Sequence, residues 1–167
     1  MGLDIIAFEK IEFLCADPDS ADSPYDVDDE SFAHLYPNDD FPSRADALVR
    51  GVYRSTGKRM EFRAGSYSGY SAWREALARL VGTTAERVFA GTVPPAFGEL
   101  IDFADNEGLI GPQTSAKLAK DFASWKARAA THAKTMRAAE GAAFMEGYAS
   151  FQEAFELAAN GGAIQFC

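Results

Sequence analysis

The sequence changes from an extended to a helical pattern within residues 62–75, FRAGSYSGYSAWRE. Directly before this stretch, polar and apolar residues alternate over 59–63, which predicts a strand. After it, apolar residues from Trp73 onward recur at helical spacing, which predicts a helix with Ser68 or Ser71 as its N-cap. We therefore interpret residues 62–75 as a strand-to-helix junction.

This junction is a candidate binding site for a small anion. The unpaired N–H groups and the dipole of a helix start favour negative charge. Arg63 and Arg74 could add charge-assisted hydrogen bonds to a phosphate or carboxylate, and Gly65 and Gly69 allow a ligand to approach the backbone closely. The same composition is also typical of turns and packed aromatic corners, so a purely structural role stays open.

A nucleotide-like ligand would use the side chains of the junction in different ways. Arg63 and Arg74 would meet the charge, and the hydroxyls of Ser66 and Ser68 would surround it. An aromatic ring would stack on the base. The candidates for this ring are Tyr67, Tyr70 and Trp73.

A second polar loop follows residues 100–103, whose apolar character predicts a buried strand. After the loop, Gly111-Pro112 is expected to open a helix, because proline suits the first helical position. The carboxylates of the loop could hold Mg²⁺ or accept hydrogen bonds from a ribose or amine, but their composition is equally typical of a turn. The loop candidates are Asp102, Asp105, Asn106 and Glu107.

The rest of the chain predicts an α+β fold in a single domain, residues 1–167. Aromatic and β-branched residues predict a long first strand over 3–15. The turn sequence 55–58 predicts a hairpin between 51–54 and 60–63.

Two long helices are expected over 115–140 and 142–159, with Gly141 as the break between them. Their apolar stripes are assigned to the core. A short strand over 163–167 would complete a mostly antiparallel sheet of about four to six strands packed against about three or four helices.

Charge is distributed unevenly along the chain. Residues 1–43 contain one base and twelve acids, net −11, whereas residues 44–79 contain eight bases and three acids, net +5; the remaining seven bases and ten acids bring the total to −9. This acidity argues against general nucleic-acid binding. The segment 16–43 is expected to be a long acidic loop or lid, which either aids solubility or docks on a basic protein.

The composition points to a cytoplasmic protein. No apolar run approaches the roughly 20 residues of a membrane span, and the first residues lack the basic region of a signal peptide. Cys15 and Cys167 are the two cysteines, and their spacing matches no metal or redox motif.

Recognised catalytic motifs are missing from the sequence. The stretch 65–69, GSYSG, has tyrosine where a serine elbow needs its nucleophile, and the glycine spacing matches neither a P-loop nor a dinucleotide fingerprint. His34 and His132 lie in no catalytic pattern. We therefore expect no catalysis and no cofactor, with Mg²⁺ as a weak alternative.

Three stretches resemble a group of small uncharacterised proteins carried by bacteriophages and prophages. These stretches are MGLDI at 1–5, RAGSYSGY followed by WR within 63–74, and IDFADNEG followed by IGP and SAKL within 101–118. The resemblance covers most of the chain outside 16–43. It implies a phage-encoded protein of the host cytoplasm, of a kind that often counters host defence, and it carries over no catalytic residues.

Together these features predict non-catalytic binding of a small anionic, nucleotide-like ligand. Two alternatives remain. The acidic segment 16–43 could dock on a host protein and inhibit it, or Asp102 and Asp105 could support a metal-dependent phosphoesterase.

Overall fold

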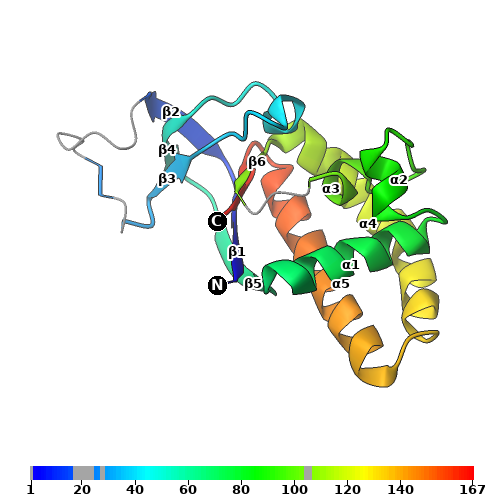
Figure 1. The fold of residues 1–167 in the computed structure, drawn as a ribbon. Helices are drawn as coiled ribbons and strands as arrows, with labels where there is room; N and C mark the ends of the chain where they lie inside the picture. Colours follow the sequence, from blue (N-terminus) through cyan, green and yellow to red (C-terminus); the bar gives the residue numbers. More distant parts are fainter. Residues whose placement is uncertain (1, 17–24, 27–28, 104–106) are drawn as a thin grey trace.

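The computed structural model describes residues 2–16, 25–26, 29–103 and 107–167. It confirms the α+β class, with two antiparallel sheets and five helices in the part of the chain that is described. The helices lie on one side of a four-stranded sheet. A three-stranded sheet lies at the end of that sheet farther from the helices (Figure 1). The predicted strands are therefore divided between two sheets.

The expected strand over 3–15 is bent into two. β1 (Leu3–Phe8) and β2 (Ile11–Cys15) are separated at Lys10, whose φ of 53° is left-handed. β1 belongs to the four-stranded sheet and β2 to the three-stranded one. The bend thus carries one continuous segment from the first sheet into the second.

The predicted hairpin over 51–63 is wrong. β4 (Gly51–Ser55) pairs with β2, and β5 (Arg59–Gly65) pairs with β1, both antiparallel. The linker between β4 and β5 does not reverse the chain, because it binds the bend between β1 and β2: the N–H of Glu9 donates to the carbonyl of Lys58 at 2.9 Å, and that of Thr56 donates to Lys10 at 3.0 Å. Two bent strands therefore run side by side through both sheets.

The four-stranded sheet has the order β5-β1-β7-β6, and the three-stranded sheet has the order β2-β4-β3. The acidic segment contains one strand among its described residues, β3 (Phe32–Leu35), and a 3₁₀ turn follows over Pro42–Ala45. β6 spans Gly108–Ile110. The expected last strand is confirmed as β7 (Ala163–Phe166), which is buried along its whole length between β1 and β6.

The strand expected over 100–103 is instead the end of a short helix, α3 (Gly98–Ile101). Leu100, Ile101 and Phe103 are fully buried, as predicted, but so short an apolar run is equally compatible with a helix and a strand. The strand of this region, β6, comes after the polar loop rather than before it.

Two long helices form a hairpin, α4 (Pro112–Ala133) and α5 (Ala138–Ala158). The chain turns over 134–137, so the predicted break at Gly141 is wrong. Gly141 lies inside α5, where a Cβ atom would press against the carbonyl of Ala133. Its small size serves the close approach of the two helices and does not end either one.

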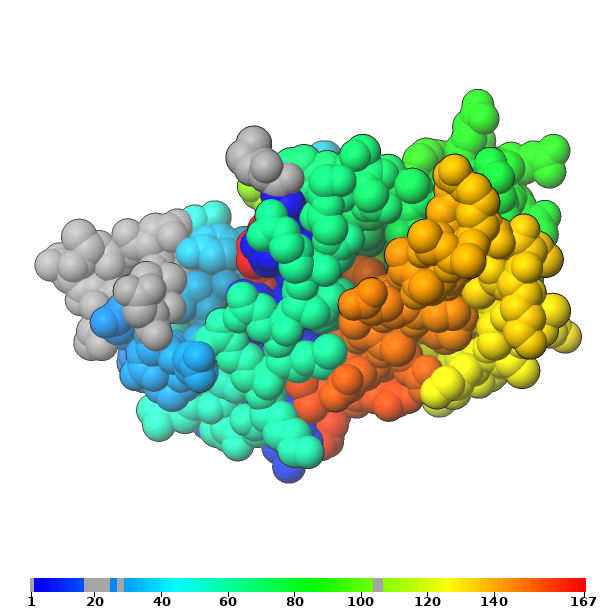
Figure 2. Space-filling model, turned by 90° about the horizontal axis from the view of Figure 1, so that it is seen from below, coloured from blue at the N-terminus to red at the C-terminus, as the bar shows by residue number. Residues whose placement is uncertain are grey.

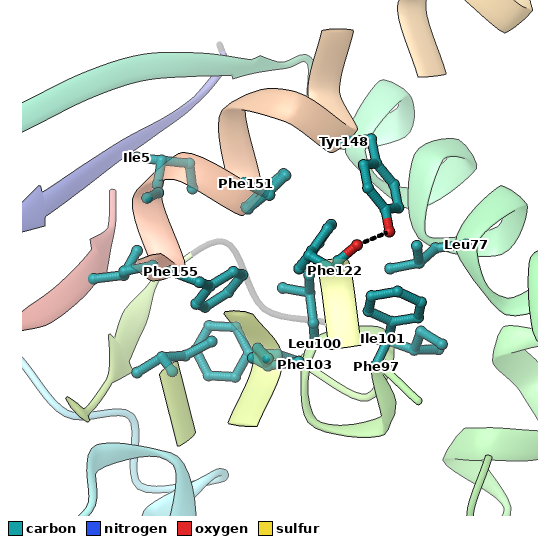
Figure 3. Close-up of a cluster of buried hydrophobic side chains, with 14 of the residues drawn as sticks. Ile5, Leu77, Phe97, Leu100, Ile101, Phe103, Phe122, Tyr148, Phe151 and Phe155 are labelled. Carbon is teal, nitrogen blue, oxygen red and sulfur yellow. Dashed lines mark hydrogen bonds between the residues drawn. The ribbon is translucent and has the colours of Figure 1, made fainter. Parts of the chain in front are cut away.

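Aromatic rings fill the core between the sheet and the helices (Figure 3). The ring of Phe122 packs against Tyr148, with centroids 4.7 Å apart, and against Phe97 at 4.9 Å. The hydroxyl of Tyr148 donates to the carbonyl of Phe122 at 2.6 Å, which gives a buried polar atom its partner and ties α5 to α4. The aromatic stripes predicted to be core are therefore core.

We expect stability to fall as the pH rises above the ordinary tyrosine pKa. Burial raises the pKa of Tyr70 and of Tyr148 above their ordinary value of 10.0. Above about pH 10 the unfolded chain therefore loses protons that the folded chain keeps, and this favours unfolding. Urea unfolding followed by circular dichroism between about pH 9 and 11 would measure the slope. Tyr148→Phe should make it shallower, and an unchanged slope in this variant would contradict the assignment.

Candidate functional site

A cleft of about 950 Å³ opens between β5, α1 (Tyr67–Leu80) and the α4–α5 hairpin. One wall is the end of β5 and the face of α1 that carries Gly69, Trp73 and Ala76. The opposite wall is a face of α5. Figure 2 looks onto this side of the molecule, where the segment from β5 into α1 (teal to green) and α5 (orange) border the hollow.

The floor of the cleft is aromatic. The indole of Trp73 stacks on the ring of Phe151, with centroids 4.6 Å apart, and its Nε1 donates to the carbonyl of Phe144 at 3.2 Å. Gly147 allows this contact, since a Cβ there would lie 2.7 Å from the indole nitrogen. Trp73 is thus held in one orientation, with part of its ring still accessible from the cleft.

Two arginines border the cleft. Arg63, at the end of β5, forms an ion pair with Asp4 at 3.3 Å, and its side chain is 59% exposed. Arg79 pairs with Glu75 one helical turn earlier, at 2.9 Å. Both pairs are exposed enough to contribute little to stability. The guanidinium of Arg63 can therefore exchange Asp4 for another anion at small cost.

The N-cap of α1 is Ser66, so the expected caps Ser68 and Ser71 are wrong. The Oγ of Ser66 accepts a hydrogen bond from the N–H of Gly69 at 3.1 Å and lies 3.1 Å from the Oγ of Ser68. The first hydroxyl after the strand thus takes the cap position. It uses one of the helix-start amides that the sequence left free for a ligand.

Tyr67 is exposed on the first turn of α1, but Tyr70 and Arg74 point into the protein. Tyr70 is 2% exposed, and its hydroxyl donates to the carbonyl of Phe103 at 3.4 Å. Arg74 is 4% exposed and donates from Nη1 to the carbonyl of Ile101 at 2.7 Å. Its guanidinium lies 4.9 Å from the centre of the Tyr70 ring, and burial lowers its pKa from the ordinary value.

The two predicted junctions, residues 62–75 and the second polar loop, therefore contact each other through α1. The contact lies on the side of α1 that faces away from the cleft. Arg63 and Trp73 line the cleft, and Ser66 and Ser68 are neighbours along the chain of its lining residues Gly65 and Gly69, whereas Tyr70 and Arg74 donate to the carbonyls of Phe103 and Ile101. Arg63 and Arg74 therefore lie on different sides of the junction and have different partners. That both bind one anion stays a prediction.

The residues of the second loop have other partners in the structure. Asp102 pairs with Arg44 at 2.9 Å, and the carbonyl of Glu107 accepts a hydrogen bond from Asn38 at 2.8 Å. Asp105 and Asn106 lie outside the described residues. Within the described ranges, no group of three or more His, Cys, Asp or Glu side chains is placed to hold a metal ion.

The second wall of the cleft was not predicted. Glu140, Phe144, Gly147 and Phe151 line it from α5 at three- and four-residue intervals. Phe144 and Phe151 belong to the apolar stripe that the sequence assigns to the core, whereas Glu140 and Gly147 lie beside that stripe. Spacing alone does not reveal where a packed helix face becomes a cleft wall.

His132, which lies in no catalytic pattern of the sequence, also lines the cleft. Its ring stands edge-on to Phe144, with centroids 5.7 Å apart. Its Nε2 is buried and has no hydrogen-bond partner among the residues that the structure describes.

No family model, curated protein or solved structure matches this chain. In the described ranges no helix combines the length and apolar character needed to cross a membrane. The geometry of the cleft is therefore the basis of the functional argument.

Proposed function

We propose that this protein binds a small anionic, nucleotide-like ligand in the cleft between α1 and α5, without catalysis. The observation that carries the proposal is the aromatic floor of a cleft whose volume, about 950 Å³, is that of a small-molecule site. The resemblance to phage proteins extends the proposal to an accessory role in the host cytoplasm, in which the bound molecule belongs to host defence.

Trp73 supports a planar ring in the ligand. Its indole is fixed by Phe151 and by the bond to Phe144, so stacking a ligand ring on it costs little side-chain entropy. Small residues on α1, Gly69 and Ala76, leave room for such a ring in the cleft, while Gly147 on α5 makes room for the indole itself.

Arg63 supports the anionic end of the ligand. It lies where β5 enters the cleft, next to the hydroxyls of Ser66 and Ser68 along the chain. Its present partner, Asp4, is an exposed carboxylate, and a phosphate offers the guanidinium a more strongly charged, bidentate partner. Binding would therefore release Asp4 to solvent.

Arg63→Ala is expected to weaken the binding of nucleotides about 10-fold or more, because a charge-assisted hydrogen bond is lost. The measurement uses Trp73 as the reporter. The protein has two tryptophans, and Trp125→Phe removes the other one, which lies on α4 under Arg128. Titrations with AMP, cyclic AMP, NAD and ADP-ribose would then follow quenching of Trp73 fluorescence.

Arg87→Ala is the matched control, because Arg87 is exposed on α2 (Ala85–Phe89) and does not line the cleft. It should leave the affinity unchanged. If no nucleotide quenches Trp73 or raises the melting temperature, the proposal fails, and docking of the acidic segment 16–43 on a host protein becomes the leading alternative. Nucleotide turnover that requires Mg²⁺ would instead support the phosphoesterase.

A further inference from the structure

The outer edge of β5 is open. β5 pairs with β1 on one side, and in the described part of the chain no strand pairs with its other side. The strand is seven residues long, and Figure 2 shows the teal segment around it uncovered on this side of the molecule. An open edge presents a row of backbone donors and acceptors that another strand can satisfy.

The side chains of β5 alternate in a way that limits which strand can pair there. Arg59, Glu61 and Arg63 are exposed on one face, whereas Met60 and Phe62 are half-buried on the other. Charged residues on an edge strand normally prevent indiscriminate pairing. Here they alternate in sign, so they also define one arrangement in which pairing is favourable.

We propose that β5 pairs with β5 of a second copy of this chain, antiparallel and centred on Phe62, to form a two-fold symmetric dimer. In this register Glu61 of each copy stands opposite Arg63 of the other, which gives two complementary charge pairs on the exposed face. On the half-buried face Phe62 meets Phe62, and the irregularity at Ala64, which has no partner in β1, lies outside these pairs. The two four-stranded sheets would become one continuous sheet.

Other registers are less favourable. Centring on Glu61 would place Glu61 against Glu61 and Arg59 against Arg63, and centring on Arg63 would place Arg63 against itself. Registers centred between two residues would pair exposed with half-buried positions and put the helices of the two copies on opposite faces. Centring on Met60 pairs Arg59 with Glu61, but it overlaps only the first three residues of the strand.

The dimer interface and the proposed ligand site share Arg63, and residues 62–65 of β5 also line the cleft. Glu61 does not line the cleft, so its variants test the dimer without removing a proposed ligand contact. Sedimentation velocity of the full chain over a wide concentration range measures association directly. We expect the wild-type protein to dimerise, and Glu61→Arg and Arg63→Glu each to weaken association by about 10-fold or more.

A mixture of the Glu61→Arg and Arg63→Glu variants provides the decisive measurement. Chains with Glu61→Arg carry arginine at both positions, and chains with Arg63→Glu carry glutamate at both, so a mixture restores both charge pairs in a heterodimer. The double variant, which exchanges the two charges, should dimerise like the wild type. If only Glu61→Arg weakens association, the Met60-centred register replaces the proposed one.

Arg54→Glu is the control for charge reversal. Arg54 is exposed on β4, opposite Glu12 in the other sheet, so its reversal places two acids side by side, as Arg63→Glu does with Asp4. It should leave the dimer intact. A wild-type protein that stays monomeric at the highest concentration, or single variants that associate as the wild type does, would overturn the proposal, and melting curves would verify that every variant is folded.

Discussion

Phe151→Ala is expected to lower the free energy of unfolding by about 4 kcal/mol, because it removes a fully enclosed ring and leaves a cavity. Phe151 is 1% exposed, and its ring lies 4.6 Å from that of Trp73 and 5.1 Å from that of Phe62. It thereby joins α5 to both α1 and the sheet. Urea unfolding followed by circular dichroism would measure the loss from the shift in midpoint at constant slope.

Phe13→Ala is the matched control for this prediction. Phe13 is 48% exposed on β2 and touches the edge of the Tyr53 ring, so its removal should cost less than about 1 kcal/mol. A similar loss in the two variants would show that Phe151 is not the packing centre described here. Nucleotide affinity should also fall in Phe151→Ala, since the support under Trp73 is lost.

Arg74→Ala is expected to lower the free energy of unfolding by about 3 kcal/mol, because it removes a buried side chain together with its hydrogen bond. The guanidinium lies over Tyr70 and donates to Ile101, so it fastens α1 to α3. The change should therefore lower the melting temperature strongly. Differential scanning calorimetry would measure it.

Arg79→Ala on the same helix is the control, because the side chain of Arg79 is 67% exposed and its pair with Glu75 contributes little. It should melt within a degree or two of the wild type. If Arg74→Ala melts there as well and instead loses nucleotide binding, Arg74 belongs to the ligand site and the assignment to structure is wrong.

The contrast between Arg63 and Arg74 shows which features of the site can be predicted from the sequence and which cannot. It identified the strand-to-helix junction and the helix correctly, whereas the role of the two arginines in binding one anion stays a prediction. Helical spacing, however, did not distinguish the face of α1 that meets α3 from the face that meets the cleft, because both faces carry an arginine and an aromatic residue. Only the positions of α3 and α5 decide which arginine is buried.

The pairing of the strands could also not be predicted from the local sequence pattern. Residues 51–54 and 60–63 were recognised as extended, yet their partners lie near the start of the chain. A turn sequence predicts a hairpin when nothing else competes for its backbone. Here Glu9 competes, since its carboxylate accepts a hydrogen bond from the N–H of Lys58 at 3.0 Å.

The assignment of the core succeeded where several elements agree. The aromatic residues of α4 and α5 follow one face over many turns, and long periodic segments are the most reliable signal in a sequence. The apolar segment 100–103 is only four residues long, which is too short to show such a period. Its burial could be predicted, but its secondary structure depends on Phe97, whose φ of 61° starts α3 in a conformation that the sequence does not reveal.

The position of β7 has a consequence for biosynthesis. β7 lies between β1 and β6, which are far apart in the sequence, and it is made after both of them. While the ribosome still holds residues 163–166, the inner edges of β1 and β6 have no strand between them, and the apolar face of α5 has an incomplete sheet to cover. Folding of the four-stranded sheet must therefore wait until β7 has left the ribosome, and in that interval the unpaired edges are open to aggregation or to chaperones.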